Sequence, residues 1–116
     1  MQLSHTVLDE GIMDSLRDLQ AHGGPDFLVQ LTTAFVEDGS MRLVDLRTGL
    51  NERDDLRVRQ AAHSLKGMSG ALGATDMAGL CSTLEQQAVA AAVDASLAAQ
   101  IEIEFTRVTA ALRSLI

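Results

Sequence analysis

The sequence has no tryptophan and no tyrosine, and its aromatic share of 3% consists of phenylalanine alone. Because 47% of the residues are nevertheless hydrophobic, the core must be built mainly from Leu, Ala, Val, Ile and Met, a composition that favours packed helices over sheets. The only proline, Pro25, stands near the start of a long periodic stretch, where its fixed φ suits a first helical turn. These features predict an all-α fold.

Further absences narrow the class of protein. The single cysteine, Cys81, excludes an intramolecular disulfide framework and is typical of a reducing compartment. No apolar run approaches the ~20 residues of a membrane span, and the amino terminus lacks the basic-then-apolar pattern of a signal peptide. A net charge of −7 argues against nucleic acid or an anionic membrane as a partner. We expect a cytoplasmic chain with a protein partner.

The length of 116 residues suits a single domain, residues 1–116, with one modest core. Apolar spacing predicts five helices: 8–21, 25–51, a third from after Asp54 and Asp55 to about Gly73, a fourth from a cap at Thr75 to before Asp94, and 95–115. Short connections favour antiparallel neighbours. We therefore expect an antiparallel up-down-up-down four-helix bundle, with the additional short N-terminal helix covering one end.

Particular residues are expected to end or bend these helices. Asp54 and Asp55 are candidate N-caps, and Thr75 is the candidate cap of the fourth helix. Gly73 is a suitable residue for a left-handed helix end. Gly39, inside the second helix, either bends it or admits a neighbouring element.

The third predicted helix has a polar face centred on His63. On a wheel of 100° per residue, the pole opposite His63 is apolar and consists of Val58, Ala61, Leu65, Met68 and Leu72. Within about 60° of His63 lie Arg59, Lys66, Gly67 and Gly70. Two glycines inside a helix cost roughly 1 kcal/mol each relative to alanine, and the close approach of another molecule would explain them.

This face has the residue types that phosphoryl transfer needs. An imidazole near pH 7 offers a free nucleophilic nitrogen without an added base. Transfer also requires in-line geometry and cations that offset charge on the moving oxygens, and Lys66, the only lysine, lies one turn from His63. Residues 56–75 contain Arg57, Arg59 and Lys66 and no acidic side chain, so they should attract an acidic pocket, although both arginines are equally compatible with a merely solubilising role.

The stretch AHSLKGMSGALGA, residues 62–74, closely resembles the signature of histidine phosphotransfer (HPt) domains, in which lysine and then glycine follow the histidine. LCSTLE at residues 80–85 and GGPDFLVQLTTAF at residues 23–35 extend the resemblance over most of the chain. It implies a helical bundle whose histidine is phosphorylated at Nε2 and exchanges the group with receiver-domain aspartates. The receiver brings Mg²⁺, and the bundle binds no cofactor or metal of its own.

By this resemblance, His63 is the phosphoacceptor and Lys66 steadies the phosphoryl oxygens. Gly67 must stay small so that the receiver can approach, and Ser69 and Gly70 fall among the small residues near the site. With Arg59, these three residues form the expected partner-binding set. Glu85 stands where some family members carry a polar side chain that hydrogen-bonds the histidine ring, and it would then leave Nε2 free; the alternative is an ordinary residue on the flank of the fourth helix.

The expected partners are response-regulator receiver domains, a hybrid sensor histidine kinase, or both, and the expected state is a monomer. The chain is then a phosphocarrier without turnover of its own, either free-standing or the cytosolic C-terminal module of a membrane-bound kinase. Competing interpretations are a histidine-kinase dimerisation domain and an adaptor bundle that docks a receiver or kinase without accepting phosphate. A metal or di-iron bundle enzyme would need inward Glu-x-x-His pairs, and the sequence has none.

Overall fold

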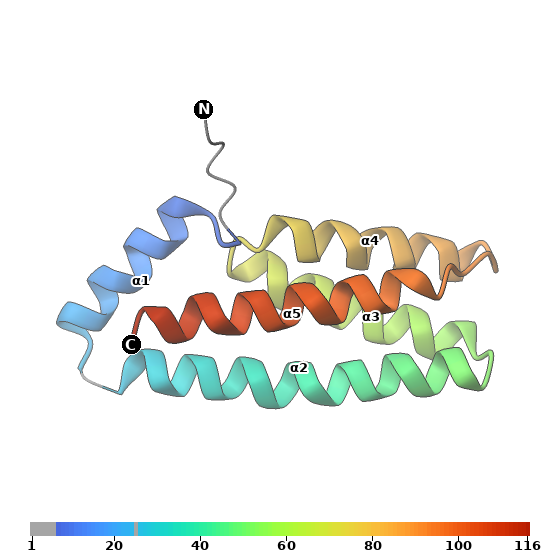
Figure 1. Ribbon diagram of the computed structural model, residues 1–116, viewed down its shortest axis with the longest axis horizontal. Coiled ribbons are helices and arrows are strands. Elements are labelled where there is room, and N and C mark those ends of the chain that lie inside the picture. The colour runs from blue at the N-terminus through green and yellow to red at the C-terminus, as the bar shows by residue number, and fades with distance from the viewer. Residues whose placement is uncertain (1–6, 25) are drawn as a thin grey trace.

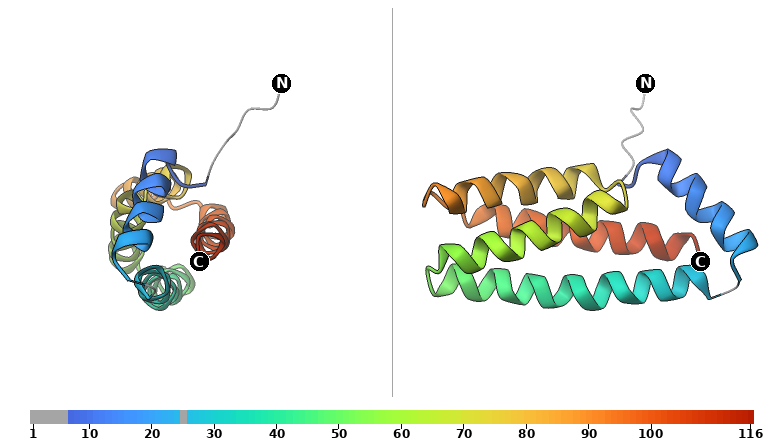
Figure 2. Two further views of the ribbon diagram at one scale, coloured as in Figure 1. Left: turned by 90° about the vertical axis from the view of Figure 1, so that its left-hand side faces the viewer. Right: turned by 180° about the vertical axis from the view of Figure 1, so that it is seen from behind.

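The computed structural model describes residues 7–24 and 26–116, and its regular elements there are five helices. They are α1 (Glu10–His22), α2 (Phe27–Asn51), α3 (Asp55–Ala71), α4 (Thr75–Val89) and α5 (Ser96–Ser114). Helices α2 to α5 run alternately in opposite directions as a bundle, and α1 crosses one end of it (Figures 1 and 2). The predicted bundle and its covering helix are therefore confirmed, while the expected first turn at Pro25 lies outside the described residues.

The helix ends differ from prediction by a few residues. At the start of α3, Asp54 is the N-cap and accepts the backbone N–H of Arg57, while Asp55 is already helical. The expectation that Thr75 caps α4 is wrong, because Thr75 is the first helical residue and Ala74 occupies the cap position without a side-chain hydrogen bond. The chain turns at Gly73 as predicted, and α4 begins one residue earlier than expected.

Gly73 also joins α1 to the bundle. Its φ of +68° is the left-handed conformation predicted for this helix end. Its carbonyl accepts the N–H of Asp9 at 2.9 Å, and a Cβ added here would lie only 2.6 Å from the Asp9 Cβ. Leu8, predicted to lie in the first helix, precedes α1 and is fully buried. The segment before α1 is thus held against the turn between α3 and α4.

The core is aliphatic apart from one aromatic pair. The rings of Phe35 on α2 and Phe105 on α5 stack with their centroids 5.0 Å apart. A Cβ on Gly39 would lie 2.2 Å from Cε1 of Phe105, so this glycine lets the ring pack directly against the backbone of α2. Of the two alternatives for Gly39, admission of a neighbour is confirmed.

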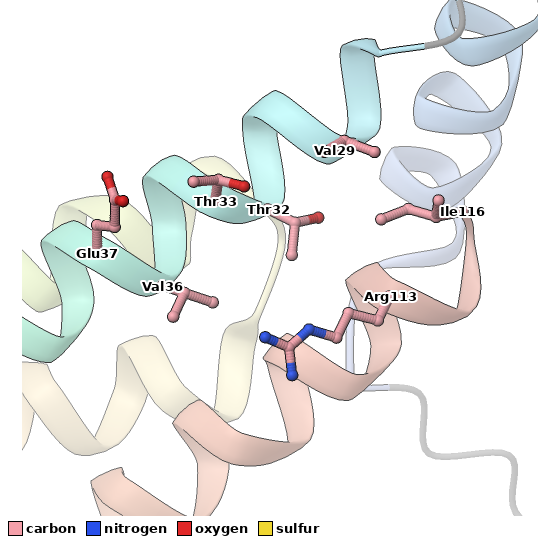
Figure 3. Close-up of a pocket in the computed structure, with 7 residues that line it drawn as sticks. All are labelled: Val29, Thr32, Thr33, Val36, Glu37, Arg113 and Ile116. Atoms are coloured by element: carbon pink, nitrogen blue, oxygen red, sulfur yellow. The ribbon is translucent and has the colours of Figure 1, made fainter.

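Helices α2 and α5 pack less completely near the amino-terminal end of α2. A hollow of about 320 Å³ opens between them, and Thr32, Val36 and Arg113 are among its lining residues (Figure 3). Among the described residues, the buried hydroxyls of Thr32 and Thr109 lack a hydrogen-bond partner. This hollow shares no residue with the surface around His63 described below.

Within the described ranges, no helix combines the length and the apolar character needed to cross a membrane.

Candidate functional site

His63 lies on the outward face of α3, as the helical wheel predicted. Its side chain is 67% exposed. On the opposite side of the helix, Val58, Ala61 and Leu65 are buried, and Met68 is partly buried against the same core. A reacting group can therefore reach the imidazole without any opening of the bundle.

Glu85 on α4 contacts both polar side chains of the α3 site. Its Oε2 lies 2.8 Å from Nδ1 of His63, and its Oε1 accepts a hydrogen bond from Nζ of Lys66 at 2.6 Å. Helices α3 and α4 pack side by side (Figure 1). Glu85 therefore comes level with His63 and Lys66, which lie one turn apart on α3. Of the two alternatives for Glu85, the hydrogen bond to the histidine ring is the one that the structure shows. The contact with Lys66 was not predicted.

The pKa of Glu85 is lowered from 4.5, first by the hydrogen bond from Lys66 and also by the hydrogen bond from His63, while partial burial opposes both. The carboxylate is therefore ionised near neutral pH and can only accept hydrogen bonds. Nδ1 of His63 must then be the donor, which leaves the lone pair on Nε2. Glu85 thus sets the tautomer of the His63 ring, and Nε2 is the nitrogen left free to act as a nucleophile.

We expect Lys66→Met to raise the pKa of Glu85, because it removes the largest cause of the lowered value. A carboxylate with a depressed folded-state pKa adds stability above its unfolded value, here 4.5, and that stability is lost as the pH falls through the folded-state pKa. The wild type should therefore exceed Lys66→Met in unfolding free energy above about pH 5, and the difference should shrink in acid. A ¹³C NMR titration of the Glu85 carboxyl, with denaturant unfolding at each pH, measures both effects.

Arg107→Met is the matched control, because Arg107 forms a comparable pair with Glu104 on α5 at 2.9 Å. It should leave the pKa of Glu85 unchanged. An unchanged Glu85 pKa in Lys66→Met would contradict the importance of the Lys66 hydrogen bond.

The carboxyl-terminal side of the site is open. Gly67 and Gly70 are exposed, and a Cβ built on either would meet no other atom within 4 Å. Neither glycine has the positive φ that would exclude a side chain. The fold itself therefore does not require glycine at these two positions.

Ser69 does not lie on this surface. It is fully buried, and its hydroxyl donates to the carbonyl of Leu65 at 2.7 Å and to that of Lys66 at 3.2 Å. The expectation that Ser69 takes part in partner binding is wrong, because its position on the flank of α3 is covered by neighbouring helices.

Fewer residues contribute uncompensated positive charge near His63 than the sequence suggested. Arg57 pairs with Asp45 at 3.4 Å and with Glu52 at 3.6 Å, so its charge is compensated locally. Arg59 is exposed and has no carboxylate partner within the described part of the chain. It lines a hollow of about 410 Å³ whose lining residues are Arg59, Gln60, His63, Ser64, Glu85 and Val89.

Behind the site, the thiol of Cys81 is fully buried. Burial is the main cause that raises the pKa of Cys81 to about 12, and the charge of Glu85 adds to the increase while Lys66 opposes it. The thiol is thus protonated at neutral pH. Across residues 7–24 and 26–116, no three His, Cys, Asp or Glu side chains gather as metal ligands.

Known proteins share this sequence pattern. The family model of the Hpt domain matches residues 30–111. Histidine-containing phosphotransfer protein 1 of Arabidopsis thaliana is 38% identical over 92 residues, which make up 71% of this chain and 60% of that protein. Histidine-containing phosphotransfer protein 5 of the same plant is 27% identical over 88 residues, or 70% of this chain and 56% of that protein. The chain therefore spans less than two thirds of the length of these relatives.

The bundle as a whole also has a solved counterpart. It matches the crystal structure of histidine-containing phosphotransfer protein B (HptB) from Pseudomonas aeruginosa PAO1 with a TM-score of 0.82 and 32% sequence identity. That match covers 96% of this chain and 95% of HptB, so α1 and the four bundle helices are compared together. The resemblance drawn from the stretch around His63 is confirmed, and the chain belongs to the Hpt domain family.

Proposed function

We propose that this chain is a phosphocarrier of a two-component phosphorelay, which accepts a phosphoryl group on His63 from one receiver-domain aspartate and passes it to another. The observation that carries the proposal is the exposed imidazole whose Nδ1 is hydrogen-bonded to the ionised Glu85. Proteins of the Hpt family act in such relays with receiver domains and histidine kinases. An exposed carrier histidine fits that task, because two different partners must reach it in turn.

In the proposed transfer, the Nε2 lone pair of His63 attacks the phosphorus of an aspartyl phosphate in line with the bond to the aspartate oxygen. The N–P bond forms as the P–O bond breaks, and the electron pair of that bond leaves with the aspartate carboxylate. The ring then carries a positive charge, which the carboxylate of Glu85 stabilises through the Nδ1–H. The next receiver reverses these steps.

Lys66 contributes a cation beside the transferred group. In the free protein its Nζ donates a hydrogen bond to Glu85. In the proposed transfer, this ammonium group donates to a phosphoryl oxygen instead. The Mg²⁺ that offsets further charge would be held by the receiver. The chain would thus cycle between two partners in the cytoplasm as a monomer, with no turnover of its own.

Transfer from purified receiver domains tests the proposal. Receivers phosphorylated on aspartate should label the wild-type chain with a phosphate that is labile in acid and stable in base, as expected for a phosphorus–nitrogen bond. Absence of label with every receiver encoded by the source genome would contradict the proposal and favour an adaptor that docks without accepting phosphate.

Gly67→Gln should slow transfer from a receiver by about tenfold, equivalent to a steric cost of about 1.4 kcal/mol in docking. The added side chain would occupy the open space beside His63, one turn along α3. Gly79→Gln is the control, since Gly79 on α4 also has no atom within 4 Å of a built Cβ. Stopped-flow transfer rates measure the effect, and equal rates for both variants would remove the argument from access.

A further inference from the structure

Two large apolar side chains near His63 are exposed and take no part in the core. Leu56 on α3 is 56% exposed, and Val89 on α4 is 66% exposed. Leu56 stands seven residues before His63. The side chains of Leu56 and His63 therefore project from the same side of α3, about 10 Å apart along the helix axis.

Val89 comes to this face through the packing of α4. Helices α3 and α4 run antiparallel (Figure 1). Glu85 of α4 lies beside His63, with its Oε2 2.8 Å from Nδ1 of the ring. One turn further along α4, Val89 therefore comes level with Arg59, one turn before His63. The hollow of about 410 Å³ confirms this placement, because Arg59, His63 and Val89 all line it.

The two sides of His63 thus differ in chemistry. Toward the carboxyl end of α3, Gly67 and Gly70 offer open space. Toward the amino end, apolar side chains border a guanidinium that has no carboxylate partner within the described part of the chain. The carboxyl-terminal side therefore leaves room for a partner to approach closely, and the amino-terminal side offers apolar surface that a partner can bind.

We propose that Leu56, Arg59 and Val89 form the contact by which a receiver domain docks, and that the receiver presents an apolar side chain next to a carboxylate at this position. The inference rests on the function proposed above. A second copy of this chain is a poor occupant, because each copy has a net charge of −7 and a dimer across this face would cover His63. A receiver must lie against this very surface for its aspartate to reach Nε2.

The chemistry of the three residues suits brief encounters. Burial of two aliphatic side chains supplies affinity, and the arginine attracts the acidic surface and orients it. A contact that rests on three side chains should dissociate after each transfer, as a carrier between two partners requires.

The test compares Leu56→Gln and Val89→Gln with Ile103→Gln. Ile103 is 60% exposed but lies on α5, whose direct neighbours in the bundle are α2 and α4. Each variant is phosphorylated by two donors: the receiver domain that exchanges phosphate fastest with the wild type, and phosphoramidate, a small molecule that needs no docking. With the receiver below saturation, we expect Leu56→Gln and Val89→Gln to accept phosphate from it about fivefold more slowly than the wild type, or slower still, and Ile103→Gln to accept it at the wild-type rate.

The phosphoramidate rates should be the same for all four proteins. Receiver transfer as fast in Leu56→Gln and Val89→Gln as in the wild type would overturn the docking surface while leaving the phosphocarrier function intact. An equal slowing in Ile103→Gln would overturn it too, because the loss would then not be local. A wild type that no donor labels would instead overturn the proposed function itself.

Discussion

His63→Gln abolishes labelling of the chain by a phosphorylated receiver and leaves the bundle folded; this is the largest effect that we expect. A carboxamide has no nucleophilic nitrogen at neutral pH, so no N–P bond can form. The His63 side chain is 67% exposed and points away from the core, and glutamine is a good helix former. Radiolabel transfer measures the first effect, and circular dichroism during heating measures the second.

His22→Gln serves as the control for His63→Gln. His22 is also an exposed helical histidine, at the carboxyl end of α1, where its ring lies 3.3 Å from a carboxylate oxygen of Asp18. This variant should accept label like the wild type. If His63→Gln still accepted label, the phosphate acceptor would be another residue. If His63→Gln lost its helical circular dichroism signal, the outward orientation of the His63 ring would be contradicted.

The second large effect concerns stability. Gly39→Leu should lower the free energy of unfolding by about 3 kcal/mol, because the new side chain would have to displace the ring of Phe105. That ring cannot move freely, since it is nearly buried and stacks on Phe35. The melting temperature should fall by roughly 10 °C.

Gly79→Leu separates this steric cost from the general effect of replacing a helical glycine. Gly79 is exposed on α4 with open space around a built Cβ, so leucine there should stabilise the chain by up to about 1 kcal/mol. Thermal and urea unfolding of both variants measure the difference. If Gly39→Leu were as stable as Gly79→Leu, the direct packing of Phe105 on the backbone of α2 would be refuted.

Periodicity explains why the fold was predictable. The four bundle helices each bury a row of apolar side chains whose spacing is visible in the sequence, so these helices could be predicted from that spacing. The outward orientation of His63 followed from a helical wheel. Helix ends were less predictable, because the capping position depends on where the chain turns. Thr75 has a suitable side chain for a cap, but Gly73 turns the chain so that Ala74 takes the position.

Contacts between helices could not be derived from one helix at a time. A wheel gives the face of α3 but not the register of α4 against it, so the pair between Lys66 and Glu85, 19 residues apart, had no signal in the pattern. Ser69 lies about 120° from His63 on the wheel, where only the neighbouring helices decide between exposure and burial. They bury it.

The compensation of the Arg57 charge also depends on contacts between helices, so the sequence of α3 alone could not predict it. Residues 56–75 contain no acid, yet Arg57 is neutralised by Asp45 and Glu52, which belong to α2 and its end. With Arg57 paired in this way, Arg59 is the arginine of residues 56–75 that remains available to a partner. Leu56 could have been found from the sequence, because the wheel places this leucine on the polar face of α3 with His63. An apolar side chain exposed on a polar face is a sign of an interaction surface.

The buried thiol of Cys81 has a practical consequence for work on this protein. A thiol that is fully buried and has its pKa raised to about 12 does not react with alkylating reagents while the helices stay packed. Since it is the only cysteine, any alkylation reports an opening of the bundle. The rate at which an alkylating reagent traps the Cys81 thiol in native buffer therefore reports how often the bundle opens, without an added label or a substitution.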